Sequence, residues 1–222
     1  MDNLKNIIEE KIPLTIGEVI EIAEKTDSNP VDVIIAEGQI QTGKTEAQVL
    51  DDVLSQFEHN LKAIEIGITS GESLLFGRVG AELLAIEGPK IIEDEFVDKA
   101  LVYTLAAQVG NHTIGLRPCA GTGDPCPYTG FIKAMMDSGY SKEQIARTAS
   151  LILKIGSVFR VGKVSTGCNM EGFGAGACAI SAAFVYLKGG TARDMEKAMV
   201  LALSPTIGVP CTPRVMVPGL CA

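Results

Sequence analysis

Six cysteines are the residues of this chain whose type and spacing could do chemistry. All lie in the C-terminal half of the 222 residues: Cys119, Cys126, Cys168, Cys178, Cys211 and Cys221. The first residues contain no basic stretch followed by an apolar one, so we see no secretory signal and expect a cytoplasmic, reducing location. In that setting, grouped cysteines serve more often as metal ligands or catalytic groups than in disulfides.

Three of the cysteines, Cys168, Cys211 and Cys221, each directly follow a short stretch that contains glycine or proline. We therefore expect them in loops, where sulfur and nearby backbone N–H groups can face an iron–sulfur cluster. Three thiolates on a four-iron cluster leave one iron open, and an open iron is a Lewis acid. The alternative is that these cysteines are small buried hydrophobes. No Cys-x-x-Cys pair is present, which argues against a zinc ribbon or a ferredoxin-type site.

The composition excludes several other classes of function. The 19 Lys and Arg against 27 Asp and Glu give a net charge of −8, which argues against nucleic acid as a partner. No apolar run reaches the roughly 18 residues that a membrane span needs. Hydrophobic residues make up 46% of the chain and aromatic ones only 5%. This content excludes disorder and predicts a core of aliphatic side chains.

The first hundred residues predict one helix after another, because apolar side chains recur there at helical spacing. The predicted helices are Ile16–Lys25, Val31–Glu37, Glu46–Ile66, Ala81–Glu87 and Asp94–Val109. Thr15 and Glu18 form a capping-box pattern before the first of them, and Thr45 can cap the longest. Gly38 and Gly67 are expected to end the second and third.

In the second half, glycine and proline concentrate in expected loops between helices. The predicted helices are Thr129–Asp137, one from the cap Ser141 to about Ile155, Gly174–Leu187, and one from the cap Thr191 to about Leu203. Gly174–Leu187 consists largely of small residues, so we expect it to be central and buried. The predicted fold is all-α and bundle-like, a single domain over 1–222. It has a helical N-terminal part, 1–99, and a glycine-rich core, 100–222.

Four segments resemble motifs of the alpha chain of iron–sulfur L-serine dehydratases. Arg117–Gly123 resembles the family's Pro-Thr-Ala-Gly-Ser loop, and Gly167–Glu171 is similar to its Gly-Cys-Gln-Ala-Glu motif. Gly208–Pro213 resembles its Gly-Leu-Val-Cys-Asp-Pro motif, and Val217–Cys221 lies where the family has its third cluster cysteine. The match spans roughly residues 100–222 in order and in spacing, whereas residues 1–99 match only in helical character.

The resemblance implies a 4Fe–4S cluster on Cys168, Cys211 and Cys221. It also implies an ammonia-lyase that removes water from L-serine, or a related small β-hydroxy acid, and releases pyruvate and ammonia without pyridoxal phosphate. One alternative keeps the cluster but removes sulfide from L-cysteine. Another is a non-catalytic iron–sulfur-binding or sensing subunit. A fourth possibility is a helical scaffold with incidental cysteines.

By the same resemblance, the substrate would lie against a glycine-rich loop, whose N–H groups can hold a carboxylate. The loop residues are Cys119, Ala120, Gly121, Thr122 and Gly123. Two residues are candidates for the base that takes the α-proton. Glu171 follows Cys168 by three positions, and His112 lies just before the loop, where the family has a small residue. We expect His59 to be solvated on its long helix.

The remaining cysteines are interpreted as bystanders. Cys119 replaces a threonine of the family beside the loop, and Cys126 lies seven residues later. These two could lie near the cluster, trap a thiol, or be buried and inert, and we expect them to be inert. Cys178 is expected in the core. Family chains usually continue through further helices after the third cluster cysteine, whereas this sequence stops one residue after Cys221. We therefore expect either a truncated piece or a companion beta subunit in a heteromer, with further self-association also considered.

Overall fold

The computed structural model describes residues 2–74, 76–87, 92–117, 125–160 and 174–205. Its helices are α1 Asp2–Glu9, α2 Ile16–Thr26, α3 Pro30–Thr42, α4 Glu46–Thr69, α5 Val79–Leu84, α6 Glu95–Ile114, α7 Pro125–Asp137, α8 Lys142–Arg160, α9 Ala177–Leu187 and α10 Ala192–Leu203. Within these ranges there is no strand, only an isolated bridge between Ser73 and Gly77. The predicted all-α class is confirmed.

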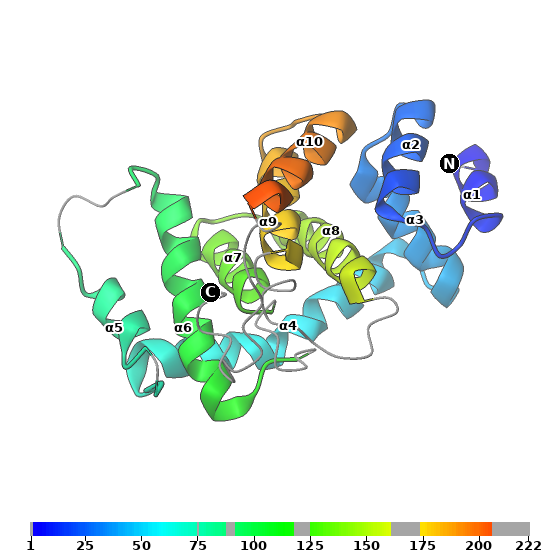
Figure 1. Ribbon diagram of the computed structural model, residues 1–222. Coiled ribbons are helices and arrows are strands. Elements are labelled where there is room, and N and C mark those ends of the chain that lie inside the picture. Colours follow the sequence, from blue (N-terminus) through cyan, green and yellow to red (C-terminus); the bar gives the residue numbers. More distant parts are fainter. Residues whose placement is uncertain (1, 75, 88–91, 118–124, 161–173, 206–222) are drawn as a thin grey trace.

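The longest helix, α4, connects the N-terminal helices α1, α2 and α3 with the helices α5 and α6 (Figure 1). At one end α1, α2 and α3 pack together, and α4 runs from there toward α5. The helices α6, α7 and α8 pack on α4, while α9 packs between α8 and α10. In the part of the chain that the structure describes, no helix is both long enough and apolar enough to cross a membrane.

The predicted helix starts are confirmed where a capping side chain marks them. The Thr15 hydroxyl accepts from the Glu18 N–H, and the Glu18 carboxylate accepts from the Thr15 N–H, which completes the capping box of α2. Thr45 and Thr191 begin α4 and α10 with the same reciprocal pattern. These starts could be predicted because a cap involves only residues three positions apart.

Several predicted helix ends are wrong. Gly38 and Gly67 do not stop their helices, since α3 continues to Thr42 and α4 to Thr69. Both glycines instead accommodate a neighbouring helix: a Cβ on Gly38 would lie 3.2 Å from the Val49 side chain, and one on Gly67 would overlap α6. In addition, α6 runs five residues further than Val109, α7 begins before Thr129, and α1 was not predicted.

The tightest packing in the described residues is the crossing of α4 and α6. A Cβ on Gly67 would lie 1.9 Å from the carbonyl oxygen of Ala106, and one on Gly110 would lie 1.9 Å from that of Ala63. Each helix therefore carries a pair of small residues four positions apart, which is about one turn. The pairs face one another in opposite order, so the helices run antiparallel with their backbones in contact.

Two further glycines bring neighbours onto α6. A Cβ on Gly130 of α7 would lie 2.5 Å from the Thr104 nitrogen, and one on Gly80 of α5 would lie 2.8 Å from the Cα of Ala106. Because α4, α5 and α7 all approach its backbone, α6 is the central helix of this half of the molecule. Close approach of this kind leaves no room for added side chains.

Charged side chains join α8 to the N-terminal helices. Glu37 of α3 is 3% exposed, and its carboxylate lies 2.7 Å from the Lys154 Nζ of α8. The same carboxylate accepts from the Leu14 N–H at 2.8 Å, so the buried charge is both paired and hydrogen-bonded. Arg147, also on α8, bridges Asp32 and Glu46.

The small-residue helix α9 is buried, as its composition predicted. Its inward positions are Cys178, Ala179, Ala182 and Ala183. A few aromatic rings pack where α9 meets α6 and α7: Phe184 lies edge-on to Phe131 at 5.0 Å and to Phe96 at 5.7 Å between ring centroids. An aromatic cluster therefore lies at the contact between α9 and its neighbours.

Replacing Gly67 with alanine should lower the free energy of unfolding by about 3 kcal/mol, because the added methyl group collides with the backbone of α6. Urea unfolding followed by circular dichroism measures this loss. The matched control is Gly17→Ala, an exposed glycine of α2 whose Cβ would meet nothing closer than 3.9 Å. Equal stability of the two variants would contradict the close crossing.

Candidate functional site

Most residues of the predicted site lie outside the described residues. These are Cys119, Ala120, Gly121, Thr122, Gly123, Cys168, Glu171, Cys211 and Cys221. The roles assigned to them stay predictions. What the structure describes is the framework on either side of the segments 118–124, 161–173 and 206–222, together with His112.

The helix ends that flank two of these segments meet at one place. A Cβ on Gly174, just before α9, would lie 3.5 Å from the Phe159 ring near the end of α8. It would lie 3.8 Å from Leu203 near the end of α10. In the sequence, the segment with Cys168 lies between Phe159 and Gly174, and the other two proposed ligands follow Leu203. The flanks of all three proposed cluster cysteines are therefore adjacent.

Arg117, the residue before segment 118–124, is held by a buried asparagine. Asn60 of α4 is 2% exposed; its Nδ2 donates to the Arg117 carbonyl at 2.7 Å, and its Oδ1 accepts from the Arg117 N–H at 2.8 Å. One side chain thus satisfies both backbone groups of Arg117, the way a paired strand would. Sequence analysis missed Asn60, because nothing local relates it to a residue 57 positions away.

Two more side chains hold the backbone beside Arg117. The Asn111 Oδ1 accepts from the Leu116 N–H at 2.7 Å, and the His59 Nε2 lies 2.7 Å from the Gly115 carbonyl oxygen. His59, expected to be solvated, is partly exposed and also contacts the end of α6. Together with Asn60, these contacts fix the backbone of residues 115–117, directly before the predicted substrate loop.

His112 lies in the last turn of α6 with its ring exposed. Its Nε2 is 3.4 Å from the Nε2 of Gln108, and the Gln108 Oε1 accepts from the Cys126 thiol at 3.1 Å. Gln108 and Cys126 are fully buried. The structure therefore brings His112 to the end of α6 that precedes segment 118–124, and connects it to the first turn of α7, which follows that segment.

Both cysteines in the described residues are buried, as expected. Burial raises the pKa of the Cys178 thiol to about 11, and this thiol donates to the Met199 carbonyl at 3.5 Å. A metal ligand must be a thiolate, so a buried thiol with this pKa is a poor ligand. In the described ranges no three or more His, Cys, Asp or Glu side chains form a potential metal cluster. A cluster would therefore have to use the other cysteines.

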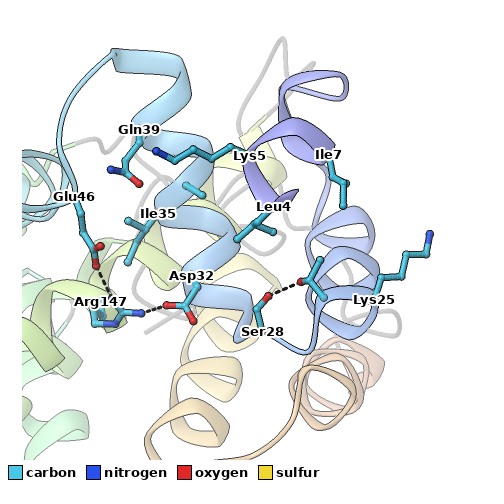
Figure 2. A pocket seen from close by; sticks show the side chains of 12 residues that line it. Leu4, Lys5, Ile7, Lys25, Ser28, Asp32, Ile35, Gln39, Glu46 and Arg147 are labelled. Atoms are coloured by element: carbon cyan, nitrogen blue, oxygen red, sulfur yellow. Dashed lines mark hydrogen bonds and ion pairs between the residues drawn. The ribbon is translucent and has the colours of Figure 1, made fainter. Parts of the chain in front are cut away.

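A cavity of about 680 Å³ lies among α1, α3 and α8, away from these residues. Figure 2 shows Leu4 and Ile35 among the side chains that line it, and Arg147 paired with both Asp32 and Glu46 at its edge. Arg147 thus compensates part of the negative charge of the two carboxylates. None of the residues predicted for catalysis, substrate or metal lines this cavity, so it is separate from the candidate site.

Replacing Asn60 with alanine should lower the free energy of unfolding by about 2 kcal/mol, because two backbone groups of Arg117 lose their partners. Amide hydrogen exchange gives the local signature: the Arg117 N–H should lose protection while α4 and α6 keep theirs. Gln56→Ala, an exposed position one turn earlier, is the control and should change stability by less than about 0.5 kcal/mol. Retained protection at Arg117 would contradict this role of Asn60.

The chain is similar to a protein named "Probable L-serine dehydratase, alpha chain" from Bacillus subtilis (strain 168). The two are 27% identical over 216 residues, which cover 89% of this chain and 69% of the relative. No model of a known protein family matches the chain, and no solved structure matches it. An alignment over 89% of the chain extends beyond residues 100–222 into the N-terminal helices. This distant similarity supports the resemblance drawn from the motifs.

Proposed function

We propose that this chain is the alpha subunit of an iron–sulfur-dependent lyase that deaminates L-serine, or a related small β-hydroxy acid, to pyruvate and ammonia. The observation that carries the proposal is the similarity along 89% of the chain to a probable L-serine dehydratase alpha chain. The four motifs between residues 117 and 221 also support it, since they occur in the family's order. The fold adds adjacent flanks for the segments that carry the proposed ligands.

The proposed ligands of a 4Fe–4S cluster are Cys168, Cys211 and Cys221. When bound, such a cluster supplies a Lewis-acidic iron that makes the β-hydroxyl a better leaving group. The two other thiols with described surroundings, Cys126 and Cys178, are buried and donate hydrogen bonds within the core. The meeting of Phe159, Gly174 and Leu203 supports a common site for the three ligands.

The chain's own groups would bind and orient the substrate. In the proposal, backbone N–H groups of residues 120–123 hold the carboxylate, and the contacts from His59, Asn60 and Asn111 fix the backbone that leads into this segment. Glu171 or His112 takes the α-proton, the bond between Cβ and the hydroxyl oxygen breaks, and the departing hydroxide takes that proton from the base to become water. The resulting enamine tautomerises and hydrolyses to pyruvate and ammonia.

The remaining parts of the proposal concern the assembly. The relative is named an alpha chain, so we infer a beta subunit that completes a heteromer with this chain. We further infer that residues 1–222 act as one catalytic domain in the cytoplasm. Activity is then expected from the complex rather than from this chain alone.

Anaerobic co-expression of the chain with its genomic neighbour should give a protein with about four irons and four sulfides per chain. Cys168→Ser, Cys211→Ser and Cys221→Ser should each abolish turnover and lower the iron content, because each removes one thiolate ligand. Iron and sulfide analysis, together with pyruvate formation, measures both effects. The matched control is Cys178→Ser, a core position that should keep most of the activity.

Two outcomes would overturn this ligand set. An iron-free protein after careful anaerobic reconstitution contradicts the cluster itself. A Cys178→Ser variant as inactive as the other three contradicts the choice of ligands.

Incubation with single substrates should separate the lyase from its alternatives. We expect pyruvate and ammonia from L-serine, measured by coupled assays, at a kcat/KM higher than that for L-threonine, L-cysteine or hydroxy acids. Sulfide release from L-cysteine at a higher kcat/KM would instead identify a desulfidase. A loaded cluster with no turnover of any of these compounds would favour a sensing subunit.

A further inference from the structure

A glutamine at the centre of the molecule connects His112 to the core. Gln108 is 0% exposed on α6, one turn before His112. Its amide lies between two partners, the Cys126 Sγ at 3.1 Å and the His112 Nε2 at 3.4 Å. Since a buried amide needs hydrogen-bond partners, this side chain is held at both of its polar atoms.

The chemistry of the partners determines which way the amide points. A thiol is a weak hydrogen-bond donor and a still poorer acceptor. The amide oxygen therefore faces Cys126, and the Gln108 Oε1 accepts from the S–H. The amide NH₂ then faces the His112 Nε2, which accepts from it in one of the two tautomers of the ring. In a neutral imidazole that accepts at Nε2, the proton lies on Nδ1.

The other histidine has the opposite arrangement. The His59 Nε2 lies 2.7 Å from the Gly115 carbonyl oxygen, which can only accept a hydrogen bond. His59 therefore carries its proton on Nε2. The chain has only two histidines. The tautomer of each ring therefore reports on one hydrogen bond near the end of α6: that of His112 with Gln108, and that of His59 with Gly115.

We propose that Gln108 is a positioning residue that fixes His112 in the Nδ1–H tautomer, so that His112 donates a hydrogen bond to the substrate's carboxylate. The lone pair of Nε2 is occupied by the Gln108 amide, and the neutral ring presents an N–H donor at Nδ1 from an exposed position. His112 then does not take the α-proton, and Glu171 is left as the candidate base. This inference rests on the proposed function for the identity of the anion.

Nuclear magnetic resonance of the full ¹⁵N-labelled chain tests the tautomers directly, without turnover. Long-range correlations between ring protons and ring nitrogens distinguish Nδ1–H from Nε2–H, and a His59→Gln variant assigns the two rings. The expected result is Nδ1–H for His112 and Nε2–H for His59. A neutral His112 protonated at Nε2 would overturn the proposal.

Gln108→Met extends the test to the enzyme, because a thioether has no N–H to donate to the Nε2 of His112. His112 should lose its preference for the Nδ1–H tautomer, and the KM for L-serine should rise about tenfold at unchanged kcat and iron content. Thr104→Val, a buried hydroxyl on the same helix with its own bond to the Ala100 carbonyl, is the control for KM and tautomer.

The two measurements separate the possible failures. A fall in kcat at unchanged KM in Gln108→Met would assign the proton transfer to His112 and overturn the donor role. Unchanged kcat and KM would overturn it as well. If this variant does not fold, the tautomers of the unmodified chain still decide the positioning role. Absence of turnover in the unmodified complex contradicts the proposed function, whereas the tautomers are read independently of it.

Discussion

The rest of the structure depends on the contact between the backbones of α4 and α6. Gly67 and Gly110 allow it, because a side chain on either would overlap the carbonyl of Ala106 or Ala63. This contact fixes the position of each helix along its axis relative to the other. Asn60 lies about one turn before Ala63 on α4. The asparagine therefore reaches the backbone of residue 117 just beyond the end of α6. A looser crossing would separate these groups, since hydrogen bonds weaken steeply with distance.

The same helix carries the polar groups of the candidate site. Gly130 seats α7 directly on α6, and this packing brings Cys126 to Gln108 and, through Gln108, to His112. Farther away, the buried pair of Glu37 and Lys154 holds α8 against α3. The end of α8 in turn meets the start of α9 and the end of α10. Small residues and one buried ion pair thus hold the framework around the segments with the proposed ligands.

Local signals in the sequence correctly predicted the helical class, the capping box of α2, Thr45 and Thr191 as capping residues, and the burial of α9. They did so because caps and amphipathic spacing involve residues within one or two turns. The same reasoning failed at Gly38 and Gly67. A glycine near a helix end and a glycine beneath a crossing helix look alike in sequence, and only the neighbouring helix distinguishes them.

Neighbouring residues alone are enough to predict the all-α class, most helix starts, the small-residue pattern and the order of the cysteine motifs, because these are local properties. Three contacts follow only from the tertiary packing: Asn60 holds Arg117, His59 contacts the end of α6, and Gln108 links His112 to Cys126. They join α4 to the residues that follow α6, and α6 to α7. The helices come close enough for these contacts because glycines on α4, α6 and α7 let the backbones touch. No local sequence pattern specifies which glycines do so.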